Sequence, residues 1–301
     1  MARQITIDYA DFWGTFRPDN NYFTRLLSPY YDLVRSDRPD FLLYSVFGKT
    51  HRERSGTRIF YTGENHRPDF RECDFAFTFD FVDRENHYRL PLYAWYGEPS
   101  SLVKGTVDAE RILAQKTGFC NFVYSNHRCK TRNRFFEMLS KYKRVDSGGR
   151  WMNNMGGPVP DKYSFISRYK FTIAFENNSH PGYTTEKIAE PMWAMSLPIY
   201  WGNPLVHLDF NPRSFINYFD YGSLEALVER VIEVDRDDAL YCEIMRQPWY
   251  HGDKVNHYVR PENVLSQFER IFTPEAPTVW GTHRSIIPMS IPLNDANKRV
   301  A

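Results

Sequence analysis

The sequence has little that would mark a secreted, membrane-spanning or strongly charged protein. Its four cysteines form no CxxC pair, and free thiols in a reducing compartment are predicted. No apolar run reaches the length of a membrane span or of a signal-peptide core. The formal net charge is only +1, which provides no global field for nucleic acid or for an acidic surface. We therefore expect a cytoplasmic chain without nucleic acid as a partner.

Common cofactor and catalytic motifs are also missing. There is no GxGxxG or GxxxxGK[ST], so neither a dinucleotide fingerprint nor a P-loop is present. No GxSxG marks a serine nucleophile, and the nine histidines show neither HExxH nor paired ligand spacing. The single DxD triplet, Asp235-Arg236-Asp237, falls in an amphipathic helical pattern. We interpret it as a solvated helix face and not as a metal site.

The most informative segment is 169–203, YKFTIAFENNSHPGYTTEKIAEPMWAMSLPIYWGN. Two apolar runs, 171–175 and 197–201, enclose a polar turn and the start of a helix, as in a parallel strand–helix–strand unit covered on both faces. Polar residues gather where the first strand ends, which is where open α/β sheets bind ligands. This segment predicts a site for a phosphorylated ligand.

Two series of elements are predicted along the chain. The first contains strands at 5–12, 41–47, 58–62, 75–81 and 88–95. After a linker at 95–118 with a short helix near 107–116, the second contains strands at 119–125, 171–175 and 197–201 and helices at 131–142, 185–195 and 224–247. Pro191 is expected to end or kink its helix, and the last 25 residues read as a tail. Alternating elements predict an α/β fold with two Rossmann-like domains facing a cleft, 1–100 and 101–301.

Three polar clusters lie at predicted strand ends. Glu64, in YTGEN after the third strand, suits a general base if partial burial raises its pKa, and a solvated turn residue equally fits these five letters. The run SNHRCKTRNR at 125–134 places four cations at a strand–helix junction, which suits a pyrophosphate or, alternatively, a solvated loop.

The third cluster comprises Glu176, Asn177 and Asn178, followed by YTTEK at 183–187. Glu186 and Lys187 are adjacent on a helix and point about 100° apart, so they reach different parts of one ligand. Lysine at a helix start neutralises phosphate, and glutamate accepts hydrogen bonds from sugar hydroxyls. The alternative is an ordinary first-turn glutamate beside a surface lysine.

These clusters, in this order, resemble the α-1,3-fucosyltransferase family, most closely its bacterial members. YTGEN, CDFAFTFDFVD and YRLPLY match the acceptor-domain signature of the family. The donor-domain signature is matched by FVYSN at 122–126, YKFTIAFEN at 169–177, YTTEK at 183–187, LPIYWGNP at 197–204 and FNPRSFIN at 210–217. The resemblance runs from about residue 58 to 218.

The resemblance implies a B-type glycosyltransferase fold with an acceptor domain at 1–100 and a donor domain at 101–301. It implies GDP-β-L-fucose as donor, a GlcNAc hydroxyl of a lactosamine-type glycan as acceptor, and an inverting reaction giving an α-1,3 or α-1,4 linkage of the Lewis type. By position, Glu64 would be the catalytic base, and Arg132 and Lys187 the phosphate binders. Further donor contacts are implied at Asn126, Glu176, Asn177, Tyr183 and Glu186.

The resemblance also implies that no metal or other cofactor is required, with stimulation by a divalent cation left open. A bacterial, cytoplasmic protein is expected, peripheral at the inner membrane in full-length form. Two alternatives remain at this point: a glycosyltransferase with another nucleotide-sugar donor, and a non-catalytic module that binds glycan or nucleotide.

Overall fold

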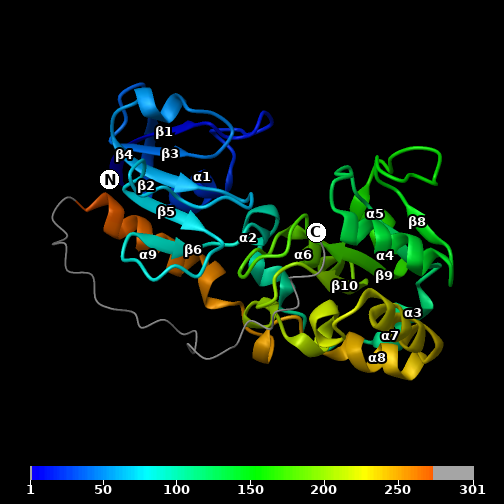
Figure 1. Ribbon diagram of the computed structural model, residues 1–301. Helices are drawn as coiled ribbons and strands as arrows, with labels where there is room; N and C mark the ends of the chain where they lie inside the picture. Colours follow the sequence, from blue (N-terminus) through cyan, green and yellow to red (C-terminus); the bar gives the residue numbers. More distant parts are fainter. Residues whose placement is uncertain (1, 274–301) are drawn as a thin grey trace.

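The computed structural model describes residues 2–273, which form two lobes, each built on a parallel β-sheet (Figure 1). The first sheet has the order β2-β1-β3-β4-β5-β6 and the second β11-β10-β9-β7-β8. The first sheet consists of β1 (Arg3–Ala10), β2 (Tyr31–Arg35), β3 (Phe41–Tyr44), β4 (Thr57–Tyr61), β5 (Phe75–Thr78) and β6 (His87–Arg89). The second sheet contains β7 (Gly118–Phe122), β8 (Val145–Ser147), β9 (Tyr169–Phe175), β10 (Leu197–Trp201) and β11 (Ile216–Asn217). The predicted α/β class with two Rossmann-like units is confirmed.

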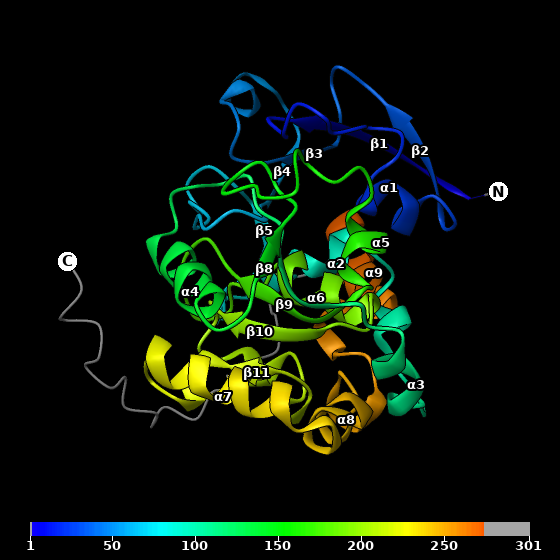
Figure 2. The ribbon, with the colours of Figure 1, turned by 90° about the vertical axis from the view of Figure 1, so that its right-hand side faces the viewer.

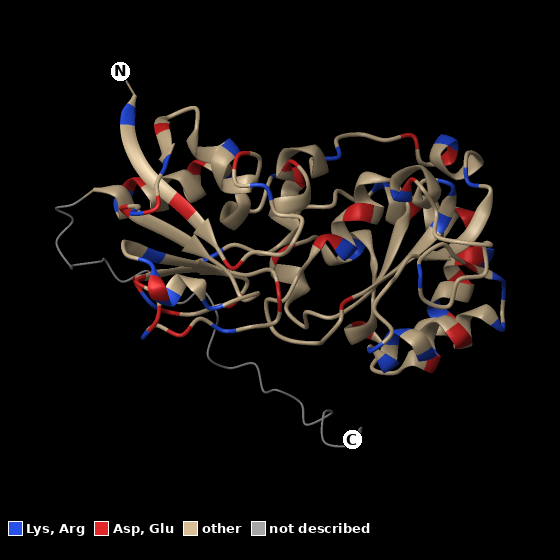
Figure 3. Cartoon of the chain, turned by 90° about the horizontal axis from the view of Figure 1, so that it is seen from above, with Lys and Arg blue, Asp and Glu red and all other residues tan. Residues whose placement is uncertain are grey.

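Helices pack against both sheets (Figure 2). They are α1 (Tyr22–Leu27), α2 (Tyr93–Tyr96), α3 (Ala109–Ala114), α4 (Lys130–Ser140), α5 (Lys162–Ile166), α6 (Glu186–Trp193), α7 (Leu224–Arg236), α8 (Asp238–Arg246) and α9 (Pro261–Phe272). Lys/Arg and Asp/Glu residues are interspersed over both lobes (Figure 3), in keeping with the small net charge. Within residues 2–273, no helix combines the length and apolarity that a bilayer crossing requires.

The central strand β9 shows why the second sheet was predictable. Six of its seven residues are buried, and it pairs in parallel with β7 on one side and β10 on the other. A strand covered on both faces has no polar alternation, which is the pattern that the sequence shows. Helix α6 ends at Trp193, two residues after Pro191, as that proline predicted.

Three predictions about regular structure were wrong. The long helix at 224–247 is two helices, because the Asp237 backbone is extended and its carboxylate caps α8 by accepting from the Leu240 amide. The strand at 88–95 ends at Arg89 and gives way to α2 after Pro91, which has no amide hydrogen for a sheet. Asp235 of the DxD triplet is buried and accepts a hydrogen bond from Tyr142 at 2.9 Å, so it is not on a solvated face.

Helix α9 returns to the first lobe after the chain has built the second. Its Phe268 ring stacks on Phe77 of β5, with centroids 4.9 Å apart, and meets Phe23 of α1 edge-on at 5.5 Å. The chain therefore crosses between the lobes twice, near residues 97–108 and 247–260, and the predicted division at residue 100 did not include this return. The predicted tail, residues 277–301, lies outside the described residues.

The two crossing segments are bonded to each other. The Asp253 carboxylate accepts the backbone N–H of Lys104 at 2.8 Å and that of Gly105 at 2.7 Å. Strands of both sheets run toward the region between the lobes, so the carboxyl ends of the two sheets face each other (Figure 1). All four cysteines are free and buried.

Candidate active site

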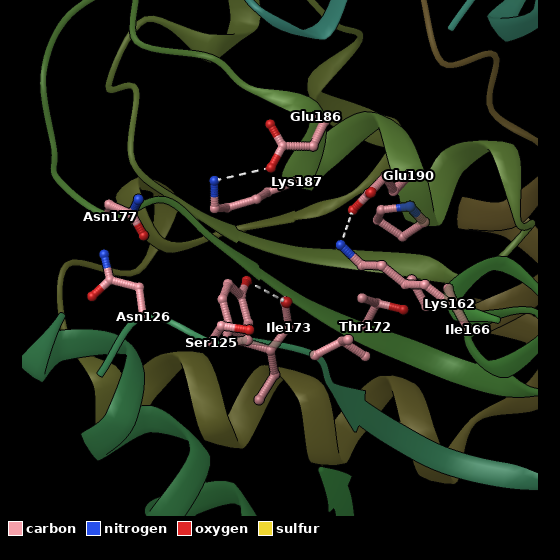
Figure 4. Close-up of a pocket in the computed structure, with 13 residues that line it drawn as sticks. Ser125, Asn126, Lys162, Ile166, Thr172, Ile173, Asn177, Glu186, Lys187 and Glu190 are labelled. Atoms are coloured by element: carbon pink, nitrogen blue, oxygen red, sulfur yellow. Dashed lines mark hydrogen bonds and ion pairs between the residues drawn. The ribbon is translucent and has the colours of Figure 1, made fainter. Parts of the chain in front are cut away.

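A cavity of about 240 Å³ lies at the carboxyl edge of the second sheet, between β7 and β9 on one side and α5 and α6 on the other (Figure 4). Asn126 and Asn177 lie at one end of the cavity, and Lys162 and Glu190 at the other, with Lys187 near the middle. Asn126, Asn177, Glu186 and Lys187 were all predicted as site residues, and the structure brings their side chains to one cavity.

The start of α6 is fixed by a buried carboxylate. Glu176 follows β9 and is completely buried; it accepts the Thr185 amide at 2.8 Å and the Thr185 hydroxyl at 2.7 Å. Thr185 in turn caps α6 through its side-chain oxygen. Burial raises the Glu176 pKa and the neighbouring Lys187 opposes that rise. Glu176 therefore lies behind the cavity wall and supports the helix that presents Lys187.

Lys187 is the cation of the cavity wall. Its Nζ lies 3.0 Å from Thr185 Oγ1, 3.2 Å from Glu186 Oε1 and 3.4 Å from Glu176 Oε2. Burial disfavours the charged ammonium, but the two carboxylates outweigh burial and raise the Lys187 pKa well above its ordinary value. Lys187 is thus charged at neutral pH, at the N-terminal turn of a helix, where an anion is favoured.

Lys162 and Glu190 were missed by the sequence reading. They form an ion pair across the cavity, Lys162 from the first turn of α5 and Glu190 from α6. Burial raises the Glu190 pKa, which Lys162 partly offsets. The spacing of Glu186 and Glu190 was an available signal, because residues four apart share one helix face.

Arg132 lies behind the cavity and its guanidinium is completely buried. It donates to the Asn126 carbonyl at 2.6 Å and to Asn177 Oδ1 at 2.9 Å, and it stacks 3.9 Å from the centroid of the Tyr124 ring. Arg132 thereby joins the two loops that bear the cavity asparagines. Its predicted contact with phosphate stays a prediction, which would require these bonds to rearrange when a ligand binds.

Glu64 belongs to the opposite lobe. It follows β4 at the carboxyl edge of the first sheet, its side chain is exposed, and its amide donates to Thr62 Oγ1 at 2.9 Å. The neighbouring Gly63 permits close packing, because a Cβ at this position would collide with the Leu92 side chain.

Tyr183 links the two lobes. It is buried, and its ring meets that of Phe79 from the first lobe edge-on, with centroids 4.9 Å apart. Burial and then Glu176 raise the pKa of its phenol, Lys187 opposes this, and Glu64 adds to it. The carboxylate of one lobe and the ammonium of the other therefore act on the same phenol.

Two facing parallel α/β lobes, with a polar cavity at the carboxyl edge of the second and a carboxylate at the edge of the first, define the architecture of a B-type glycosyltransferase. Two family models match the chain: the α-(1,3)-fucosyltransferase FucT N-terminal domain over residues 7–96, and the glycosyltransferase family 10 (fucosyltransferase) C-terminal domain over residues 113–266. The chain belongs to glycosyltransferase family 10, the fucosyltransferases, as the sequence motifs predicted.

Comparison with individual proteins supports the same family. The chain is 32% identical over 285 residues to α-(1,3)-fucosyltransferase FucT of Helicobacter pylori, an alignment that covers 80% of this chain and 59% of that protein. It is 34% identical over 140 residues to α-(1,3)-fucosyltransferase 4 of Mus musculus, covering 44% and 32%. The chain thus spans about three-fifths of FucT and about a third of the mouse protein.

Solved structures give the same result. The fold superposes on a crystal structure of an α1,3-fucosyltransferase with GDP-fucose with a TM-score of 0.78, at 26% identity and covering 93% of each chain. The crystal structure of Anabaena Alr3699/HepE in complex with UDP-glucose shares the fold alone, with a TM-score of 0.53 and 9% identity.

Proposed function

We propose that this chain transfers L-fucose from GDP-β-L-fucose to a hydroxyl of GlcNAc in a lactosamine-type glycan, with inversion at the anomeric carbon. An α-1,3 linkage is proposed on type 2 chains and an α-1,4 linkage on type 1 chains. The observation that carries the proposal is the opposition of Lys187, charged on the cavity wall of the second lobe, to Glu64 at the edge of the first.

On the donor side, GDP is a good leaving group only when the charge developing on its β-phosphate is stabilised. Lys187 would supply this stabilisation directly, because its neighbouring carboxylates keep it protonated. Arg132 would supply it by turning from Asn126 and Asn177 toward the diphosphate. Fixed charges of this kind act without reorganisation at the moment of reaction.

Polar side chains around Lys187 would hold the rest of the donor. Glu186 lies on the cavity wall and would accept hydrogen bonds from sugar hydroxyls, while Asn126 and Asn177 would hold the nucleotide end. Tyr183 would contact the diphosphate-linked sugar from the side of the first lobe, and Glu176 would keep the start of α6 in place.

On the acceptor side, Glu64 would take the proton of the attacking hydroxyl. The acceptor oxygen then forms its bond to the anomeric carbon as the bond from that carbon to the phosphate oxygen breaks, and GDP leaves with the electron pair. Attack from the face opposite to GDP converts the β-linked donor into an α-linked product. We propose that protein cations carry the phosphate charge without a required metal.

The test is a transfer assay with GDP-fucose and both type 1 and type 2 lactosamine acceptors, followed by determination of the product linkage by NMR. An α-1,3-fucosylated type 2 product is expected. A donor panel that includes UDP-sugars, with calorimetric titration of GDP against UDP, accompanies it. Tighter binding of UDP, or transfer of a different sugar, would contradict the donor assignment.

A further inference from the structure

Two aromatic side chains lie at the carboxyl edge of the first sheet, on the side that faces the second lobe. Trp13 follows β1 and Phe47 follows β3, and their rings meet edge-on with centroids 6.3 Å apart. Phe47 is 52% exposed and Trp13 is half-buried. The loop after β1, dark blue in Figure 1, reaches from this edge toward the second lobe. We refer to Trp13 and Phe47 as the aromatic platform.

The platform is rigidly built. Asp11, at a φ of 58°, accepts the Thr50 amide at 3.0 Å and the His51 amide at 3.0 Å, and its backbone carbonyl accepts the Phe47 amide at 2.9 Å. A side chain at Gly48 would collide with the Asp11 carboxylate. A left-handed aspartate is uncommon and is retained where the surroundings demand it. The loops that bear the two rings are therefore fixed relative to each other before any ligand arrives, which lowers the entropic cost of binding.

The platform is continuous with the loop of Glu64. Trp13 meets Trp95 edge-on at 5.2 Å, and Trp95 stacks on Tyr61 at 4.9 Å, three residues before Glu64. Tyr96, beside Trp95, is 56% exposed; partial burial and the carboxylates of Glu186, Glu190 and Glu64 raise its pKa to about 12, against the opposing effect of Lys187. A chain of rings thus runs from the exposed Phe47 to Tyr61, the last residue of the strand that the loop of Glu64 follows.

An exposed, pre-organised pair of rings gains little from the core of its own lobe, and patches of this kind mark ligand sites. The negative face of an aromatic ring attracts weakly positive C–H groups. In a galactose ring the axial 4-hydroxyl leaves the hydrogens of C3, C4 and C5 together on one face, so galactose fits such a surface.

We propose that the aromatic platform is an acceptor subsite that stacks on the galactose next to the GlcNAc that receives fucose; this inference rests on the proposed function. Trp13 and Phe47 hold the disaccharide, Glu64 acts on its GlcNAc hydroxyl, and the platform thereby selects a disaccharide over a free monosaccharide. This role is separate from the donor cavity, which the second lobe forms by itself.

The experiment compares N-acetyllactosamine with free GlcNAc as acceptor in Phe47→Ala and Trp13→Ala. We expect kcat/KM for the disaccharide to fall about three- to tenfold, mostly through KM, as the loss of one aromatic contact gives. The kinetics of free GlcNAc and the dissociation constant of GDP should stay unchanged. Phe47→Tyr, which keeps an aromatic ring, should retain the preference for the disaccharide. Phe47→Leu, which is apolar without a ring, should lose it.

Tyr30→Ala is the matched control, because Tyr30 is a 57% exposed aromatic of the same lobe that precedes β2, at the opposite edge of the sheet. The subsite would be overturned by any of three results. The first is a fall in disaccharide kcat/KM in Tyr30→Ala as large as in the platform variants, and the second is an unchanged disaccharide kcat/KM in both platform variants. The third is an equal fall in kcat/KM with free GlcNAc.

Ligand-observed NMR on Glu64→Gln separates this inference from the proposed function, since it needs no transfer. Saturation transfer to the galactose protons in Glu64→Gln, and its loss when Phe47→Ala is added to that variant, would support the platform. A wild-type chain that transfers no fucose would overturn the proposed function on its own, and absence of galactose contact in the NMR experiment would overturn the platform even where transfer is found.

Discussion

Arg89 of β6 and Asp209 of the second lobe form a bidentate ion pair, at 2.7 and 2.8 Å, with both side chains buried. Arg89 also donates to the Gly182 carbonyl at 3.2 Å, and Asp209 accepts the Thr184 hydroxyl at 2.8 Å. The pair therefore ties the first lobe to the residues on both sides of Tyr183. The lobes are joined beside the candidate site and not only through the chain crossings.

Removal of this pair should be costly. Arg89→Met leaves the buried Asp209 charge without its partner, and we expect the free energy of unfolding to fall by about 3–5 kcal/mol. Urea denaturation followed by circular dichroism measures the change. Arg71→Met, which breaks the exposed Arg71–Asp69 pair, is the control and should change stability little. An Arg89→Met chain as stable as the wild type would contradict the structural role.

Glu64 is predicted to act on the acceptor hydroxyl alone. Glu64→Gln should reduce kcat for fucose transfer by at least about 10²-fold, as the loss of a general base does, while GDP binds with unchanged affinity. Transfer assays and calorimetric titration with GDP measure the two quantities. Near-normal turnover would exclude Glu64 as the base.

Lys187 is predicted to bind the diphosphate of the donor. Lys187→Met should weaken GDP binding by about tenfold or more, since a charge-assisted hydrogen bond contributes more than a neutral one. Lys141→Met, an exposed lysine that follows the C-terminus of α4, is the matched control. Equal GDP affinity in the two variants would argue against the assignment.

The environment of His87 predicts how the stability of the folded chain depends on pH. Burial, followed by the nearby Arg89, lowers the His87 pKa to about 4. Between the ordinary value near 6.5 and this value, the unfolded chain binds a proton that the folded chain does not. Stability should therefore fall by about 3 kcal/mol as the pH drops from above 6.5 to below 4, and then level off.

Urea denaturation at a series of pH values checks this expectation. His87→Gln, which can keep a hydrogen bond to the Thr78 hydroxyl that His87 contacts at 2.8 Å, should remove that part of the acid sensitivity. An identical pH profile in wild type and variant would show that the His87 pKa is the same in the folded and the unfolded chain, which would contradict the expectation.

Metal removal tests the proposal that protein cations neutralise the donor phosphates. Fucose transfer should persist in EDTA at a rate within a few-fold of that with Mg²⁺ or Mn²⁺. If EDTA abolished fucose transfer and one of these ions restored it, the proposal that protein cations suffice would be contradicted.

The sequence predicted best where local pattern and burial coincide. The run at 171–175 is apolar because β9 is covered on both faces, and the residues after it, Glu176 and Asn177, had to lie at the ligand edge. The burial of Arg132 could not be foreseen, since its partners are two loops brought together only by the sheet. For the same reason the pairing of Glu190 with Lys162, 28 residues away, could not be foreseen, although the spacing of Glu186 and Glu190 places both on one helix face.

The helix cap at Asp237 and the return of the chain to the first lobe could not be predicted from the sequence either. The helical pattern at 224–247 is continuous, and only the conformation of Asp237 divides it. Helix α9 was not predicted, and neither was the lobe that buries it, because its partners Phe23 and Phe77 lie almost 200 residues or more away in the chain.

The return of α9 to the first lobe has a mechanical consequence. Since both ends of the second lobe are covalently attached to the first, and the two attachments are bonded side by side through Asp253, the lobes cannot translate apart independently. Two crossings bonded to each other resist swivelling of one lobe about the other, which a single connection would permit.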